Sequence, residues 1–223
     1  MNTFRKLASL LLAVMMLLSM TACSKEPANN PPEFDNFASV LSLPLSQAAP
    51  KLNLTEEDLK KWDTAANSYY ETGKTVNYLG AEFDITLGIV NIGEEKDDTL
   101  FCYFGYTTVI EQDAELSAQV VHNIVKNLEN LYGDGSITIP SVESLEENLS
   151  SEKGGYSVNS WKIKEMKTKG AKAVLAWLNG NGYTTKKLNF TATIEISTNV
   201  DENNKNTGDV SISLLYGIER QAK

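Results

Sequence analysis

Hydrophobic and polar residues alternate along several segments of the chain, which is the pattern of a strand with one buried face. Segments 82–90 and 99–111 are separated by a polar turn and predict a hairpin. Segments 187–198 and 209–220 alternate most regularly, so each predicts a strand with one dry and one wet face. Further strand signals, which would extend an antiparallel sheet, occur at 69–70, 76–78, 158–166 and 171–179.

The strongest helical pattern lies at residues 114–132, where apolar residues recur every three or four positions. Asp113 stands at the N-cap position and Gly133 follows the last turn, so both ends of the helix are marked. The stripe expected to pack on the sheet consists of Leu116, Val120, Val121, Ile124, Val125, Leu128 and Leu131. His122, the only histidine, falls on the opposite side, and we expect it to be solvated, without a metal or catalytic role.

Shorter helical signals precede and follow this pattern. Thr55 and Asp58 are placed to form a capping box that begins a helix running to about residue 66. A helical turn is expected at 45–49 and a short helix at 142–149.

A helical opening followed by about three strands thus occurs twice, in residues 37–111 and 113–220. The fold class predicted is α+β, with one or more antiparallel sheets and helices packed on one face, in a single domain over residues 37–220. The pattern is typical of two tandem helix-plus-three- or four-strand units, and one continuous sheet would fit it as well. It resembles, in topology, the tandem repeats of β-lactamase-inhibitor-like proteins and the single such unit of SmpA/OmlA-type envelope lipoproteins. That resemblance concerns topology and carries no functional residue.

Strand 99–111 is apolar on both faces, which leaves two interpretations. It is either a central strand covered on each side, which we favour, or its polar-tipped aromatic residues face a groove or a partner. In the second case Tyr103 and Tyr106 would form the binding face.

The first 22 residues have the features of a secretory signal. Arg5 and Lys6 precede an apolar segment at 7–18 that is too short to span a bilayer. The segment ends in the sequence Met-Thr-Ala-Cys at 20–23, which resembles the lipobox of bacterial lipoproteins. The resemblance implies cleavage before Cys23 and a diacylglyceryl group on its sulfur, whereas an ordinary secreted protein with a chance cysteine is the alternative. Two acyl chains hold a protein stably on a membrane.

Composition adds limits on partners. The chain carries −9 and, because residues 1–22 hold two positive charges and no negative ones, the mature form carries −11. Such acidity argues against nucleic-acid binding and against attraction to anionic headgroups, so the lipid alone would hold the protein. Residues 23–36, rich in Pro and Asn, predict a flexible linker after the lipidated cysteine. Cys102, in an apolar run, is expected to be a small buried hydrophobe.

Candidate chemistry is sparse. No Ser–His–Asp or Cys–His set, zinc spacing or phosphate loop occurs, and no cofactor is expected. The loop 201–209 has alternating oxygen donors, but its glycine is misplaced for an EF-hand, so we interpret it as a hairpin tip. Asp84 and Glu195 illustrate the acid pairs that 29 acidic residues always provide, and no residue is named as catalytic.

Two functions from different classes follow. The preferred hypothesis is a non-enzymatic lipoprotein on the outer face of a bacterial cell membrane, or on the outer membrane of a two-membrane host. Its domain would bind an envelope protein, peptide or polymer. The alternative is a carboxylate-based hydrolase of cell-wall or dietary glycans, and a solute-binding component of a transporter is a weaker third idea.

Overall fold

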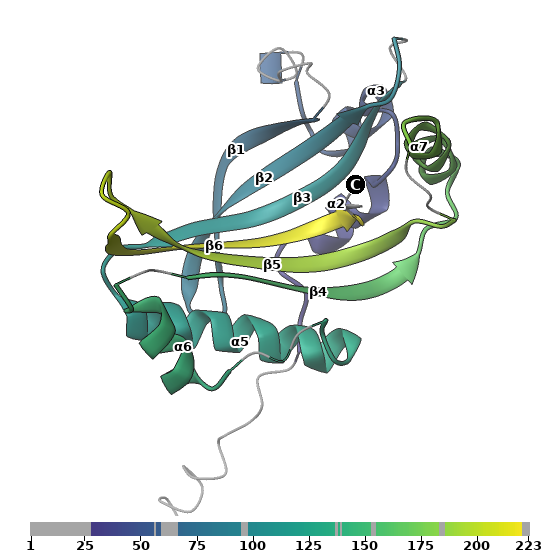
Figure 1. The fold of residues 1–223 in the computed structure, drawn as a ribbon. Helices are drawn as coiled ribbons and strands as arrows, with labels where there is room; N and C mark the ends of the chain where they lie inside the picture. Colours follow the sequence, from purple (N-terminus) through teal and green to yellow (C-terminus); the bar gives the residue numbers. More distant parts are fainter. Residues whose placement is uncertain are drawn as a thin grey trace, which may run out of the picture.

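The computed structural model describes residues 28–55, 57–58, 67–94, 98–136, 138, 140–152, 155–182 and 186–219. Within these ranges the chain forms an α+β fold, a six-stranded antiparallel sheet with five helices packed against it (Figure 1). The predicted fold class is confirmed. Cys23 and the predicted signal segment lie outside the described residues.

One continuous sheet joins the two halves of the chain. Its strands are β1 (Asn67–Tyr78), β2 (Ala81–Asn91), β3 (Thr99–Ile110), β4 (Tyr156–Glu165), β5 (Asn189–Val200) and β6 (Asn206–Ile218). The order is β1-β2-β3-β6-β5-β4, so each half contributes three neighbouring strands and the last strands of the halves pair at the centre. The helix-plus-three-strand pattern read from the sequence therefore describes both halves, which share a single sheet.

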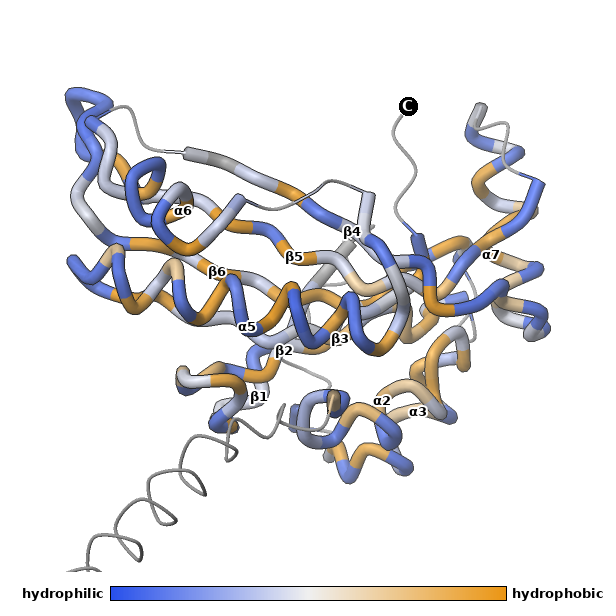
Figure 2. The backbone as a smooth tube through the Cα atoms, turned by 90° about the horizontal axis from the view of Figure 1, so that it is seen from below, coloured by the Kyte–Doolittle hydropathy of each residue, from blue (hydrophilic) through white to orange (hydrophobic). Residues whose placement is uncertain are grey.

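The helices are α2 (Phe34–Val40), α3 (Leu45–Lys51), α5 (Ala114–Tyr132), α6 (Val142–Leu149) and α7 (Lys169–Gly180). Helix α5 runs along one face of the sheet, and its apolar positions recur along its length in Figure 2. Its predicted caps are confirmed: an Asp113 carboxylate oxygen accepts from the Leu116 N–H at 2.8 Å, and Gly133 adopts φ 85°. The capping box is also present, because Thr55 and Asp58 bond each other at 2.7–3.2 Å, while most of the helix predicted after it lies outside the described residues.

The main core lies between the sheet and helices α2, α5 and α6. At its centre the rings of Phe104 and Tyr216 stack at 5.3 Å, and Phe34 meets Tyr216 edge-on at 5.0 Å. Two details of α5 differ from expectation. Leu116 is 42% exposed because it lies in the first turn, beyond the sheet contact. His122 is half-buried, so its side chain is only partly solvated.

The strand predicted at 171–179 is wrong, because this segment belongs to helix α7. The Thr168 hydroxyl caps the helix by accepting from the Ala171 N–H at 3.1 Å. Ala171 and Val174 are buried at helical spacing in a second, smaller cluster with Leu100 and Cys102 of β3. Helix α7 therefore covers one end of the sheet, where β3 begins.

The chain is packed on the domain well before residue 37, where we expected the flexible linker to end. Helix α2 starts at Phe34, and residues 29–33, which we call the N-terminal strap, bind side chains of β1, β3 and α5. The Tyr78 hydroxyl donates to the Asn29 carbonyl at 2.8 Å, and the Tyr106 hydroxyl donates to the Pro32 carbonyl at 2.5 Å. The linker prediction is therefore wrong for these residues.

Asn127 of α5 holds the strap most completely. Its side-chain nitrogen donates to the Asn29 carbonyl at 2.8 Å and to the Tyr78 hydroxyl at 2.7 Å. Its side-chain oxygen accepts from the Asn29 N–H at 3.0 Å. The Tyr132 hydroxyl adds a hydrogen bond to the Asn30 side chain. These polar groups are far apart in sequence, so only the folded sheet and α5 bring them together.

Candidate functional site

The face of the sheet that points away from α2, α5 and α6 carries mostly short polar side chains. Along β5 the residues alternate between buried apolar ones and half-buried Thr191, Thr193, Glu195 and Ser197. Along β6 the corresponding outward positions hold Ser211, Ser213 and Leu215. We call this surface the open face.

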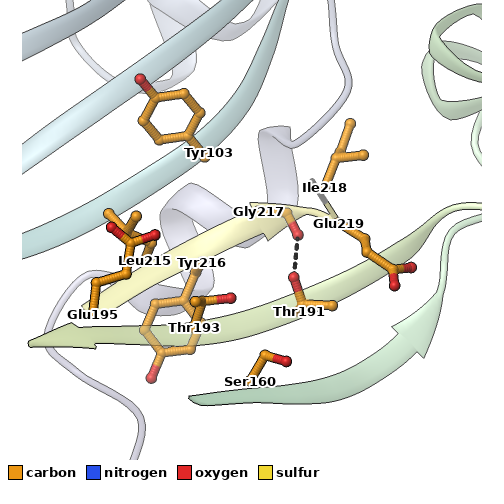
Figure 3. Close-up of a pocket in the computed structure, with 10 residues that line it drawn as sticks. All are labelled: Tyr103, Ser160, Thr191, Thr193, Glu195, Leu215, Tyr216, Gly217, Ile218 and Glu219. Atoms are coloured by element: carbon orange, nitrogen blue, oxygen red, sulfur yellow. Dashed lines mark hydrogen bonds between the residues drawn. The ribbon is translucent and has the colours of Figure 1, made fainter. Parts of the chain in front are cut away.

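A shallow depression of about 150 Å³ lies on the open face, over β6, β5 and β4 (Figure 3). The residues that give it its chemistry are Tyr103, Ser160, Thr191, Thr193, Glu195 and Leu215. The Thr191 hydroxyl is 3.4 Å from the Gly217 carbonyl and donates a long hydrogen bond to it. A volume of this size suits one side chain or one ring, whereas drug-sized ligands occupy roughly 300–1,000 Å³.

Glycines make the open face shallow beside Tyr103. Gly88 and Gly217 pair with Tyr103 from the two neighbouring strands. A Cβ atom built on Gly88 would lie 1.8 Å from Cζ of Tyr103, so the phenol ring lies directly on the Gly88 backbone. A Cβ on Gly105 would lie 2.6 Å from a Leu215 methyl group. The tyrosine and leucine side chains therefore lie flat and form an apolar floor.

Tyr103 and Tyr106, which would form a binding face under the second interpretation of strand 99–111, lie on opposite faces. They are three residues apart, and residues of a regular strand share a face only at even spacing. Tyr103 is half-buried on the open face, whereas Tyr106 is 0% exposed and faces the helices. Burial is the main cause that raises the pKa of Tyr106 far above its ordinary value, so the phenol stays protonated. The binding-face assignment is therefore wrong for Tyr106.

Asp84 and Glu195 both lie on the open face and occupy one cross-strand row through Thr107 and Ser213. Three strand spacings separate them, which is about 14 Å between backbones. Glu219 also borders the depression. Its backbone N–H donates to the Asn189 carbonyl and its carboxylate accepts from the Asn189 side chain, so Glu219 lies beside Asn189. Asn189 is six residues from Glu195 along β5, which is about 20 Å. Paired glycosidase carboxyls lie roughly 5–9.5 Å apart. The backbone separations of both pairs exceed that carboxyl-to-carboxyl range, and for Glu195 and Glu219 the excess is more than two glutamate side chains can bridge.

The remaining candidates have structural surroundings. Cys102 is buried, and burial raises its pKa from 9.0 to about 12, so it is a protonated, inert thiol, as expected of a small hydrophobe. Asp201 closes its own hairpin tip, since one carboxylate oxygen accepts from the N–H groups of Asn203 at 2.8 Å and Lys205 at 2.9 Å. Within the described ranges no group of His, Cys, Asp and Glu could hold a metal ion.

Sequence reasoning did not identify the hydroxyl-bearing residues of the depression as a group. Ser160, Thr191 and Thr193 come from two strands that pair only in the folded sheet, with Ser160 opposite Thr193. The alternation along residues 189–197 was the available signal, because it placed both threonines and Glu195 on one wet face.

Comparison with protein-family models, with curated proteins and with solved structures gave no match. Among the residues that the structure describes, every helix is too short or too polar to cross a bilayer.

Proposed function

We propose that this chain is a non-enzymatic lipoprotein, anchored outside the bacterial cell membrane through Cys23, whose open face binds an extended segment of an envelope protein or peptide. The open face carries the proposal. It is broad and shallow, and it combines a flat aromatic ring and leucine with hydroxyl groups on neighbouring strands. Such a surface can bury an extended chain, while its depression is too small to enclose a substrate.

The charge on the open face favours a cationic partner. Outward strand positions hold Glu71, Glu82, Asp84 and Glu195, and one lysine, Lys162, lies at the edge strand β4. Complementary charge would speed association and orient the segment. A hydrolase is less well supported, because the carboxylates of the depression are too far apart to act as an acid and base pair on one bond.

Site-specific photo-crosslinking in cells can test the binding face. We expect a cross-linker at Thr193 to capture one envelope protein, and the same reagent at Glu129, on the exposed side of α5, not to capture it. Glu195→Lys should abolish the Thr193 adduct, and a synthetic peptide from the captured protein's basic segment should compete. Equal capture from both positions would contradict the proposal.

Two further assays test anchoring and chemistry separately. A palmitate analogue should label the wild type and not Cys23→Ala, and equal labelling would remove the anchor. A glycan-hydrolysis screen should show no activity that Glu195→Gln abolishes. Hydrolysis lost in that variant would instead support the glycan-hydrolase alternative.

A further inference from the structure

The charge of this acidic chain is distributed very unevenly. Residues 162–187 contain seven lysines and one glutamate, which is +6, whereas the whole chain carries −9, so the rest carries −15. All seven lysines are exposed: Lys162, Lys164, Lys167, Lys169, Lys172, Lys186 and Lys187. They belong to the end of β4, to α7 and to the approach to β5, which meet beyond one end of the sheet (Figure 1). We call this group the lysine collar.

A groove with an apolar floor opens inside the collar, between α2 and the connection from β4 to α7. Its volume is about 460 Å³, and buried Leu41 and Phe190 form its floor with half-buried Met166. Its border carries two lysines, Lys164 and Lys167, and one acidic residue, Glu165, so the charged side chains that line the groove sum to +1. The Lys164 ammonium lies 5.8 Å from the centre of the Phe190 ring, within cation–π range, so its charge is held over the groove.

The wall of the groove is fixed to the rest of the domain. The hydroxyls of Ser42 and Thr168 are 2.5 Å apart and share a hydrogen bond, which joins the end of the α2 segment to the cap of α7. Gly170 packs so closely on this segment that a Cβ atom there would lie 1.6 Å from the Ser42 carbonyl oxygen. The groove is therefore a preformed feature of the folded domain.

The N-terminal strap keeps the collar near the attachment point. Because Asn29 is bound to Asn127, residues 24–28 alone separate the strap from Cys23, and an extended chain across them reaches at most about 20 Å. Helix α2, seven residues or about 10 Å long, runs from the strap to the groove, where Ala38 and Ser39 line the wall. A domain anchored at Cys23 would thus keep the collar close enough to the bilayer for its lysines to touch headgroups when this end of the domain turns toward the membrane. At contact the charges are closer than one Debye length, so salt screens them only partly.

We propose that the lysine collar and its groove bind anionic phospholipid headgroups of the membrane that carries the anchor. This inference rests on the proposed anchoring at Cys23. The net charge of the chain is negative and by itself disfavours contact with anionic headgroups. The lysine collar, however, is positive and attracts the headgroups, while the acidic remainder is repelled. The domain is therefore oriented, with the collar toward the bilayer and the acidic open face free for its partner.

The test uses the mature chain with Cys23→Ser, so that no acyl chain contributes. We expect it to float with phosphatidylcholine vesicles containing phosphatidylglycerol, not with phosphatidylcholine alone, and to be released as NaCl rises from about 0.05 to about 0.5 M. Lys164→Gln with Lys167→Gln should lower the partition coefficient about ten- to thirtyfold, since each lysine near an anionic surface contributes about one factor of five. Thermal unfolding checks that the variants fold.

The matched control is Lys126→Gln with Lys205→Gln, which removes the same charge from α5 and from the β5–β6 turn. It should bind the anionic vesicles as the parent does. Equal loss in both double variants, or equal binding to neutral vesicles, would overturn the proposal. If a soluble anionic polymer displaces the protein from the vesicles at a concentration lower than that of the vesicles, the ligand of the collar is that polymer and not the lipid. A failure of palmitate labelling would remove the anchor without altering the outcome of this vesicle assay.

Discussion

Replacing Asn127 by alanine tests whether the N-terminal strap is part of the folded domain. The buried amide makes three hydrogen bonds, two with the Asn29 backbone and one with the Tyr78 hydroxyl, at 2.7–3.0 Å. Each such bond contributes about 1 kcal/mol net, and partners left without a bond in a buried site cost more. Asn127→Ala should therefore lower the free energy of unfolding by about 2–4 kcal/mol, which corresponds to about 5–12 °C in Tm for a domain of this size.

Urea denaturation at constant m-value measures the loss, and Asn123→Ala provides a matched control. Asn123 lies one turn earlier on α5. Its side-chain nitrogen donates one long bond, at 3.4 Å, to the Leu79 carbonyl, and its side-chain oxygen accepts an exposed bond from the Gln119 side chain at 3.0 Å. We expect this control to lose less than about 1 kcal/mol. Proteolysis before residue 33 should accelerate in Asn127→Ala only. If the two variants lose equal stability, or the strap is cut equally fast in both, the reasoning is refuted.

Three further substitutions probe the sheet. Gly88→Ala should displace the Tyr103 ring, which lies 1.8 Å from the new Cβ position, and cost about 1–3 kcal/mol in urea unfolding, whereas Gly155→Ala, with open space around it, should be nearly neutral. Tyr216→Phe should leave stability unchanged or raise it by about 1 kcal/mol in thermal unfolding, because the buried hydroxyl has no partner among the described residues; a large loss would reveal one. Burial raises the pKa of the Cys102 thiol from 9.0 to about 12, so the protonated thiol favours the folded state. This contribution to stability is complete below pH 9 and disappears as the pH rises toward 12. Cys102→Ala should flatten this alkaline loss by about 1.4 kcal/mol per pH unit in pH-dependent urea titrations, and an unchanged slope would contradict the assignment.

The sequence predicts those helices and strands whose start, stop and packing face are set by residues close together in the chain. Helix α5 was predicted with both caps because Asp113, the apolar repeat and Gly133 are all local, and β5 and β6 were predicted because each has one buried face. Helix α7 was missed although Thr168 and the spacing of Ala171 and Val174 are helical signals. Its short apolar run also fits a buried strand, and the contact with Leu100 and Cys102 that selects the helix is distant in sequence.

The candidate site was less predictable, since it depends on strand register and on distant contacts. The irregular pairing between β2 and β3 near Gly88, and the placement of Tyr103 on glycines of two other strands, follow from the folded sheet. The Pro- and Asn-rich composition of the strap predicts a flexible linker, whereas the partners that hold it, Tyr78, Tyr106 and Asn127, lie far along the chain. Composition cannot report contacts of that range.

The central pairing of β3 with β6 has a consequence for how the molecule can be assembled. Residues 103–110 of one half hydrogen-bond with 210–217 of the other, and the exposed connection at 111–113 lies between the halves. A chain nicked at this connection would give two fragments, each a three-stranded antiparallel sheet with one newly exposed edge, β3 in the first and β6 in the second, and these two edges match. Mixed together, such fragments should complement each other, and intact copies at high concentration could trade halves through the same hinge.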